Sequence, residues 1–231
     1  MLVSVIIPVY NGEKYLNSCI DSVLNQTLER GKYQVIVVND GSSDGTREIL
    51  KEYGNKITIV TNSHNHGIAY TLNEGIGIAS GEWIKWLSAD DEMLPNCLET
   101  LLKHATDHNT IYYTHYHIID AKGQRIRDFV EPGRPASDLW ARYFGNGSSS
   151  IIHSDVFNKC GLFDDTLKFG EDYEFWLRAT MVYDVNITLI PEFTVNYRNH
   201  PDQLTNKVGG GNDRIIKDKI KGQVAARKTL T

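Results

Sequence analysis

The stretch "LVSVIIPVYNGEKYL", residues 2–16, sets the pattern for the first half of the chain. Its first eight residues are almost continuously apolar and rich in β-branched side chains, which is typical of a strand buried on both faces of a sheet. Asn11 follows as the predicted N-cap of a helix that runs to about Leu28 and has apolar residues along one face. A buried strand that leads into an amphipathic helix indicates the first unit of an α/β protein.

The same order of strand and helix repeats as far as residue 92. Further strands are predicted at residues 33–40, 56–62 and 82–87, and helices at 42–54 and 67–80. Strands separated by helices predict a parallel sheet with right-handed crossovers. We therefore expect an α/β fold with a mostly parallel, Rossmann-like central sheet flanked by helices.

From Pro95 onward the pattern becomes mixed. Two strand-like runs joined by a short turn at 121–123 predict an antiparallel pair. Pro191 interrupts a long strand pattern, which suggests an edge strand because proline cannot donate to a ladder. We expect helices at 95–107, 137–144, 154–161 and 171–183, strands at 110–120, 124–130, 149–153 and 187–198, a flexible segment at 206–212 and a helical tail at 212–231.

No internal repeat or linker divides the chain. We therefore expect one domain over residues 1–231, in which a nucleotide-type half (1–92) and a smaller mixed half (93–205) share one sheet. Residues 206–231 follow as a flexible segment and a C-terminal helix.

Composition narrows the class of protein. The 231 residues are 41% hydrophobic, which is enough for a sizeable core, and the net charge of −5 argues against a nucleic-acid partner. The three cysteines are far apart and odd in number, which indicates free thiols in a reducing compartment. The N-terminal apolar run is too short for a signal peptide or a membrane span, so we expect a cytoplasmic protein.

Carboxylates stand where predicted strands end, and ligands of open α/β sheets bind at the carboxyl ends of strands. Asp40 follows the second strand, where it could hold a base or ribose or simply form an Asx-turn. Asp90 and Asp91 follow the fourth strand. Two adjacent acids repel each other, so a divalent cation or a sugar hydroxyl is a natural partner for them.

A third acidic pair, Glu171 and Asp172, begins a predicted helix. The helix dipole is expected to lower the pKa of carboxyl groups there. Helix capping and general-base chemistry both suit an ionised carboxylate at this place. Motifs for other chemistries are missing: no G-x-G-x-x-G follows the first strand, and neither a P-loop nor a G-x-S-x-G is found.

Several stretches taken in order resemble the family 2 glycosyltransferases with the GT-A fold. The similar stretches are "VSVIIPVYNGEKYL" (3–16), "VVNDGSSDGT" (37–46), "NHGIAYTLNEGIGIASGEWIKWLSADD" (65–91), "GLFDDTLKFGEDYEFWLR" (161–178) and "YRNHPDQLT" (197–205). The resemblance covers roughly residues 2–200. Three positions depart from the family pattern: Asn39 and Ser88 each replace an Asp, and Leu72 replaces an Arg.

The resemblance implies roles for the matched positions. Asp172 would be the general base, and Asp91 would hold Mn²⁺ or Mg²⁺ on the donor diphosphate, with His200 as a further candidate metal ligand. The remaining implied substrate-binding residues are Pro8, Tyr10, Glu13, Asp40, Asn65, Gly67, Asp90, Glu171 and Arg198. Trp140, Tyr143 and the loop 145–150 are candidates for the acceptor site, and Gly209–Gly211 for a hinge.

The implied activity is inverting transfer of a sugar from a nucleotide-diphosphate sugar, with a UDP-sugar favoured, to a hydroxyl of a glycan or a lipid-linked glycan, as in polysaccharide biosynthesis. Residues 217–228 are lysine-rich, so peripheral contact with the inner face of a membrane and a solvated helix both stay open. The alternatives are a non-catalytic nucleotide-sugar-binding module, a nucleotidyltransferase and a purely structural α/β protein.

Overall fold

One mixed sheet runs through the molecule. The computed structural model describes residues 1–141, 145–208 and 213–228, and within these residues nine strands form the sheet. Its order is β3–β2–β1–β4–β8–β6–β9–β5, with β7 paired to β6. Along the chain the elements are β1 (Val3–Val9), α1 (Leu16–Leu24), η1 (Arg30–Lys32), β2 (Tyr33–Asn39), α2 (Thr46–Tyr53), η2 (Gly54–Lys56), β3 (Thr58–Thr61), α3 (Ile68–Gly77), β4 (Trp83–Trp86), β5 (Glu92–Met93), α4 (Cys97–His104), β6 (Thr110–Ile119), β7 (Arg125–Phe129), η3 (Ala136–Trp140), η4 (Gly147–Ser149), β8 (Ser150–His153), α5 (Ser154–Cys160), α6 (Glu171–Tyr183), β9 (Asn186–Arg198), α7 (Leu204–Val208) and α8 (Asp213–Lys228).

The first half of the sheet is parallel, as its sequence predicts. Strand β1 lies between β2 and β4, and Val3 pairs with Tyr33 on one side and with Trp83 on the other. All seven residues of β1 are buried, because helices cover both faces of the sheet. The prediction of a central strand from the apolar run at residues 2–9 is therefore confirmed.

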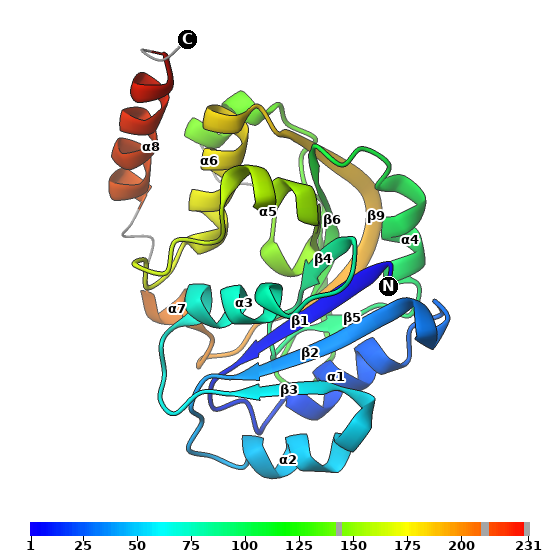
Figure 1. Ribbon diagram of the computed structural model, residues 1–231. Coiled ribbons are helices and arrows are strands. Elements are labelled where there is room, and N and C mark those ends of the chain that lie inside the picture. Colours follow the sequence, from blue (N-terminus) through cyan, green and yellow to red (C-terminus); the bar gives the residue numbers. More distant parts are fainter. Residues whose placement is uncertain (142–144, 209–212, 229–231) are drawn as a thin grey trace.

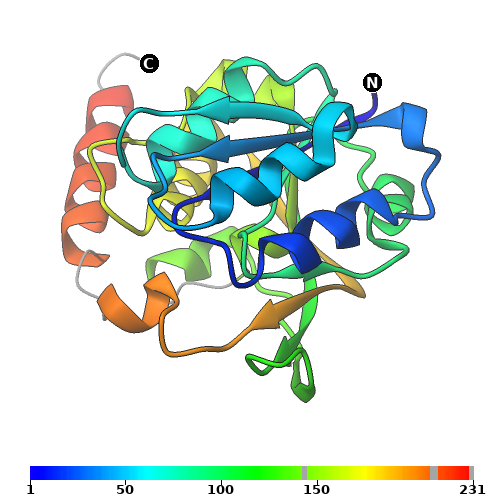
Figure 2. The ribbon, with the colours of Figure 1, turned by 90° about the horizontal axis from the view of Figure 1, so that it is seen from below.

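Strand β8 joins the two halves. It pairs antiparallel with β4 on one side and with β6 on the other, so that a single sheet continues from the parallel half into the mixed half. The predicted β6–β7 hairpin is present and projects from the body of the molecule (Figure 2). The expected α/β fold with a mostly parallel half and a smaller mixed half is confirmed.

The prediction that the strand containing Pro191 is an edge strand holds around Pro191 but not for the end of the strand. Strand β9 pairs with β6 along its length, and with β5 only near its end, through Met93 and Val195. Pro191 lies before that second pairing, where the β6–β9 register shifts between the pairs Thr114–Ile190 and His115–Phe193. A proline without an N–H is tolerated there because the register is irregular and β6 is the one paired neighbour among the described residues.

Helices form a layer on each face of the sheet (Figures 1 and 2). Helices α3, α5 and α6 pack on one face, where Trp176 and Phe175 belong to one of the two apolar clusters. Helices α1, α2 and α4 cover the other face around Leu16 and Leu98. Helix α8 lies beside α6 and buries Ile216 and Ile220 against the layer that contains α6.

The first helix is shorter than predicted. It begins at Leu16, and Asn11 does not cap it: Asn11 adopts φ 53° and its Oδ1 accepts a 2.8 Å hydrogen bond from Ser43 N. At the other end, Gln26 bonds to the carbonyls of Ser22 and Leu94, which turns the chain out of the helix before Leu28. Tertiary contacts of both flanking loops override the local helical pattern.

Other expected segments differ in part from the structure. The predicted helix at 137–144 is a 3₁₀ helix over Ala136–Trp140, while Tyr143 lies outside the described residues. The start of the predicted flexible segment belongs to α7, which ends at Val208, and Gly209–Gly211 are likewise outside. The helical tail is confirmed as α8. Among the residues described, none of the helices is both long enough and apolar enough to span a bilayer.

Candidate active site

The predicted acids gather where β1, β2 and β4 end. These strands are parallel, so their carboxyl ends lie along one edge of the sheet, and Asp40, Asp90 and Asp91 follow directly. The loop after β2 passes very close to the loop after β3. A Cβ on Gly41, which has φ 70°, would lie 2.5 Å from the backbone of His64. Only glycine permits this approach together with that backbone conformation.

Asp40 fastens these two loops together. It is 3% exposed, and its carboxylate accepts hydrogen bonds from the backbone N–H groups of His66 and Gly67 at 2.8–3.0 Å and from Asn62 Nδ2 at 3.0 Å. The predicted residues Asp40 and Gly67 are therefore in direct contact, whereas Asn65 beside them is exposed. Gly67 has φ 98° and forms the N-cap of α3.

The β1–α1 loop brings the other predicted N-terminal residues to the same edge. Pro8 is buried within β1, while Tyr10, two residues later, is 51% exposed. Glu13 bonds to the β2–α2 loop: its Oε2 accepts from Gly45 N at 2.6 Å, and its N–H donates to Asp44 Oδ2 at 3.0 Å. Glu13 thus positions the loop, and the ring of Tyr10 is open to solvent beside it.

Asp90 and Asp91 contact different residues at the end of β9 and just after it. Asp91 is 1% exposed, and its Oδ1 accepts from Arg198 N at 2.9 Å. Asp90 is half-buried, and its Oδ2 lies 2.9 Å from His200 Nε2. Residues that are more than a hundred positions apart in sequence thus form one cluster, because β9 returns to this edge of the sheet beside β5.

Two of these residues carry buried polar atoms that have no hydrogen-bond partner among the described residues: Asp91 Oδ2 and His200 Nδ1. Burial raises the pKa of the Asp91 carboxyl well above its usual range, and the charge of Asp90 raises it further. The Arg198 N–H, which donates to the other carboxylate oxygen, acts in the opposite direction and lowers this pKa. A carboxylate oxygen and an imidazole nitrogen left unpaired fit a divalent metal, which binds both atom types.

Arg198 itself is committed to protein groups. Its Nε donates to the carbonyl of Asp90 at 2.7 Å, its Nη1 donates to the carbonyl of Asp120 at 3.2 Å, and its Nη2 pairs with Glu92. The guanidinium also lies 4.8 Å above the ring of Tyr15. Sequence reasoning missed Glu92 and Tyr15 because their partner is brought to them only by β9.

The Glu171–Asp172 pair lies at the start of α6. Glu171 is 5% exposed, and burial, followed by the charge of Asp172, raises its pKa to about 8. The expectation that the helix dipole lowers the pKa at this N-terminus is therefore wrong for Glu171, because desolvation outweighs the favourable backbone N–H groups. Asp172 is half-buried, and its Oδ1 accepts from Tyr173 N at 2.7 Å.

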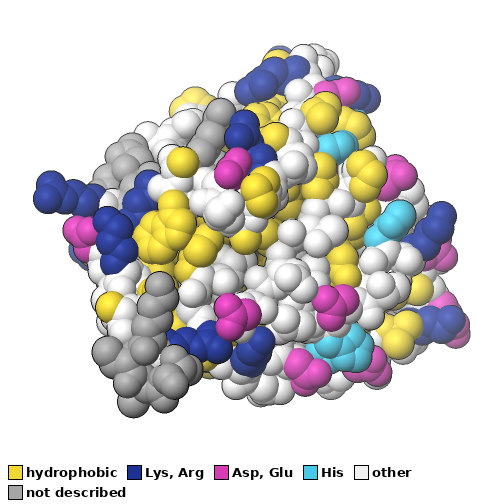
Figure 3. Space-filling view, turned by 90° about the horizontal axis from the view of Figure 1, so that it is seen from above, with side chains coloured by type: hydrophobic (Ala, Val, Ile, Leu, Met, Phe, Trp, Pro, Cys, Tyr) yellow, Lys and Arg dark blue, Asp and Glu magenta, His cyan; other side chains and the backbone are white. Residues whose placement is uncertain are grey.

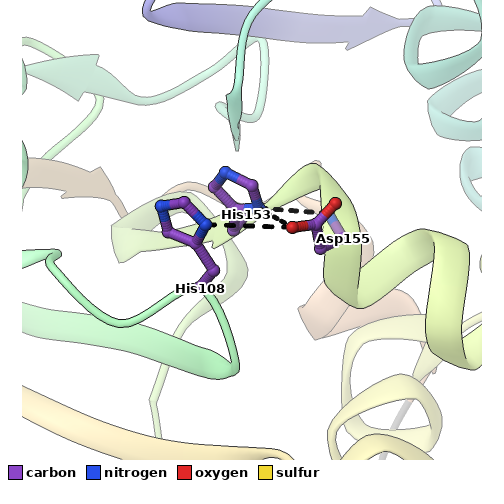
Figure 4. A group of neighbouring side chains, drawn as sticks. All are labelled: His108, His153 and Asp155. Atoms are coloured by element: carbon purple, nitrogen blue, oxygen red, sulfur yellow. Dashed lines mark hydrogen bonds and ion pairs between the residues drawn. The ribbon is translucent and has the colours of Figure 1, made fainter.

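A second possible metal site lies elsewhere and was not anticipated. Among the described residues, one group of three potential ligands comes together: His108, His153 and Asp155 (Figure 4). The Nδ1 atoms of His153 and His108 lie 3.3 and 3.8 Å from Asp155 Oδ2. Because His153 pairs with Trp83 at the start of β4, the group lies at the end of the sheet opposite Asp90 and Asp91.

The two imidazoles of this second group stack on each other. Their centroids are 3.7 Å apart and their planes differ by 7°. Each lone pair lies in the plane of its own ring, so both rings would have to turn before they could share one ion. In addition, His153 Nδ1 accepts the N–H of Asp155 at 3.2 Å. The group can hold a metal only after rearrangement.

A sheet whose parallel half gathers polar side chains at its carboxyl edge is the arrangement of a ligand-binding α/β protein. The family model described as "Glycosyl transferase family 2" matches residues 4–161. The chain therefore belongs to glycosyl transferase family 2.

Curated relatives carry the same description. An uncharacterized glycosyltransferase of Rickettsia typhi is 38% identical over 216 residues, which is 89% of this chain and 66% of the relative. One of Rickettsia felis is 34% identical over 92% of this chain and 36% of the relative. One of Methanocaldococcus jannaschii is 30% identical over 85% of this chain and 70% of the relative. The chain thus spans only part of the length of these relatives.

Solved structures share the fold. The crystal structure of S. aureus TarS residues 1–349 in complex with UDP-GlcNAc matches with a TM-score of 0.72 and 20% identity, over 98% of this chain and 72% of that one. The complex of the same protein with UDP matches with a TM-score of 0.68 and 20% identity, over 100% of this chain and 72% of that one. The GT-A type of fold implied by the sequence is confirmed.

Proposed function

We propose that the chain is an inverting glycosyltransferase that moves a sugar from a UDP-sugar to a hydroxyl group of a glycan or lipid-linked glycan. The observation that carries this proposal is the cluster at the carboxyl edge of the sheet. There Asp91 Oδ2 and His200 Nδ1 are buried and have no hydrogen-bond partner within the described part of the chain, next to an Asp90 that is still partly open to solvent. Unpaired buried atoms at a ligand-binding edge are what a diphosphate-bound cation would satisfy.

Each group at this edge has a task in the proposed reaction. Tyr10 offers an exposed ring to the base, and Asp90 accepts from a hydroxyl of the ribose or of the donor sugar. Asp91 and His200 would hold Mn²⁺ or Mg²⁺, which supplies Lewis-acid stabilisation to the departing diphosphate. Asp40, Glu13 and Arg198 hold the three loops in place through the hydrogen bonds described above.

The chemical step is a single displacement. Asp172 takes the proton of the acceptor hydroxyl while the acceptor oxygen attacks the anomeric carbon. The bond from that carbon to the diphosphate oxygen breaks, and the nucleoside diphosphate leaves with the bonding electrons. Attack from the side opposite the leaving group inverts the configuration. Glu171, with its pKa raised to about 8, stays protonated at neutral pH and leaves the pair with one proton acceptor.

The donor class is supported by the solved relatives. TarS is described in complex with UDP and with UDP-GlcNAc, so a UDP-sugar is the first donor class to test here. A nucleotidyltransferase is the less favoured candidate, because the first loop, "PVYNGEKYL", lacks the Gly-rich turn with an Arg that such enzymes would carry. A non-catalytic binding module would keep the donor site but would not need Asp172.

Peripheral membrane contact through α8 stays part of this proposal. The helix buries Ile216 and Ile220 against the layer that contains α6, while Ile215 and most of its charged side chains are exposed. Arg214, Lys221 and Arg227 are exposed, and Figure 3 shows basic side chains at the left side of the view, where α8 lies. Such contact would be electrostatic and would disappear as salt is raised.

A thermal-shift screen tests the donor site. UDP, GDP, dTDP and CMP are each added with Mn²⁺, with Mg²⁺ and with chelator, since a ligand that binds only the native state must raise the melting temperature. We expect UDP with metal to give the largest shift and chelator to abolish it. A folded protein that responds to none of these would refute the donor site and favour a structural role.

A further inference from the structure

Strand β4 carries a lysine in the core. Lys85 has no exposed surface, and the alternation of the strand places it on the same face as Trp83 and Leu87. The thiols of Cys19 and Cys97 are among the ionisable groups close to it. An ammonium is costly to bury, and a methionine would fill the same space without that cost. The charge therefore calls for a purpose other than packing.

The ammonium of Lys85 donates to the carbonyl oxygen of Ser148. Ser148 belongs to η4, the turn that follows Asn146, whose Oδ1 accepts from Ser148 N at 2.8 Å. The preceding residue, Gly147, packs flat on the indole of Trp86, where a Cβ would lie 1.7 Å from the ring. Lys85 and Trp86, adjacent in β4, thus hold the same turn from two directions.

Ser148 also forms hydrogen bonds to the loop that carries Asp90 and Asp91. Its Oγ accepts from Ser88 N at 3.1 Å and lies 3.2 Å from Ser88 Oγ, to which it donates. The carbonyl of Ser88 accepts from Asp91 N at 3.0 Å. A series of hydrogen bonds through Ser148 and Ser88 therefore leads from the buried ammonium to Asp91, the residue that precedes β5.

We propose that Lys85 is a positioning residue that acts through Ser148 and Ser88 to hold Asp90 and Asp91 in the geometry that binds the donor diphosphate. This role rests on the proposed function, although the hydrogen bonds themselves do not. Mutation of a group that orients the ligands of a metal site typically costs about 10–100-fold in affinity or activity. Burial lowers the pKa of Lys85, while the nearby Cys97 and Asp91 oppose that shift.

The substitution Lys85→Met separates positioning from packing. If Lys85 only supported the core, its loss would lower the melting temperature and leave donor affinity unchanged. Methionine removes the cost of burying an ammonium but leaves the Ser148 carbonyl without its donor, so the two effects on the melting temperature oppose each other. We therefore expect a small change in melting temperature, about tenfold or more weaker binding of UDP with Mn²⁺, and an unchanged KM for the acceptor. Ile84→Val, on the opposite face of β4, is the matched control and should lower the melting temperature alone.

A second variant tests the route. Ser148→Ala removes the hydroxyl that bonds to Ser88 but keeps the carbonyl that accepts from Lys85. It should weaken donor binding in the same direction, and the double variant should lose no more than Lys85→Met alone, because both act on one series of bonds. Full additivity of the two losses would overturn the proposal. If Lys85→Met does not fold, wild-type donor affinity in Ser148→Ala overturns it as well.

Amide hydrogen exchange gives a readout that does not depend on the donor. In Lys85→Met the N–H groups of Ser88 and Asp91 should exchange faster, while those of β1 and β2 keep their wild-type rates. Wild-type exchange at both positions would contradict the positioning role. If the wild-type protein binds no nucleotide, the proposed function fails, and the exchange rates still decide whether Lys85 orders this loop.

Discussion

Two pairs of adjacent acids, Asp90–Asp91 and Glu171–Asp172, differ in what surrounds them. Each pair has one buried member with a raised pKa, Asp91 or Glu171, and one member more open to solvent. The first pair lies among an arginine and a histidine brought by β9. Backbone N–H groups at the start of α6 support the second.

In the proposed function the two acidic pairs serve two kinds of chemistry. At Asp90–Asp91, the neighbouring basic residues, and the buried atoms that have no hydrogen-bond partner among the described residues, would bind a charged ligand and its metal. At Glu171–Asp172, burial keeps one acid protonated, so a single carboxylate is left to accept a proton. The following predictions test whether the two pairs are separable in this way.

The largest effect is expected at the second pair. Asp172→Asn removes the proton acceptor without changing the size of the side chain, so kcat should fall by about 10²–10⁴-fold. The dissociation constant for UDP with Mn²⁺ should stay within about twofold of wild type, because the donor edge is untouched. Steady-state kinetics and calorimetry on the same preparation measure both quantities. Near-wild-type turnover would remove Asp172 from the mechanism.

The next effect is expected at the first pair. Asp91→Ala should abolish the metal-dependent part of donor binding, at a loss of about 10–100-fold or more in affinity. Titration of UDP with Mn²⁺ and then with chelator measures that part directly. The control is Asp202→Asn, at an exposed acid just after His200, and this variant should bind UDP with Mn²⁺ as wild type does. If chelator weakened UDP binding to the Asp91 variant as much as it weakens binding to wild type, the metal would have to lie elsewhere.

A smaller effect concerns stability and pH. The pKa of Glu171 rises from 4.5 to about 8 on folding, so between these values the native state binds the proton more tightly than the unfolded state does. Stability should therefore fall as pH rises through this window and level off above it. Glu171→Gln mimics the protonated form and should flatten this slope, which raises the melting temperature at pH 9 by about 2–8 °C.

The measurement is the melting temperature of wild type and of Glu171→Gln at pH values from about 4 to about 9, in steps of about half a pH unit. Glu48→Gln, at an exposed glutamate of α2, is the control whose curve should run parallel to wild type. Parallel curves for Glu171→Gln would show that burial does not hold a proton on this side chain.

The smallest effect is expected at the group formed by His108, His153 and Asp155. His108→Ala removes one of the stacked rings at the opposite end of the sheet, so the metal dependence of donor binding and turnover should not change. The same calorimetric titration with Mn²⁺ and chelator measures this. A lost metal response in His108→Ala would transfer the metal from the Asp90–Asp91 pair to the group in Figure 4.

The sequence by itself determined the fold class and the parallel half of the sheet. Apolar runs such as residues 2–9 have no stable place outside a doubly covered sheet, and that burial is a local property of the run. The acids at strand ends were also predictable, because the carboxyl edge is where such sheets bind ligands. The role of Asn11 was not predictable in the same way, because its side chain bonds to Ser43 in another loop and does not cap the helix.

Only the tertiary structure decided what each acid contacts. Strand β9 carries Arg198 and His200 to Asp91 and Asp90 across more than a hundred residues, and η4 brings Ser148 to Ser88 and Lys85. Burial raises the pKa of Glu171, whereas its position at a helix N-terminus suggests a lowered pKa. Desolvation and long-range contacts depend on every element packed around a group, so a local pattern of residues does not contain them.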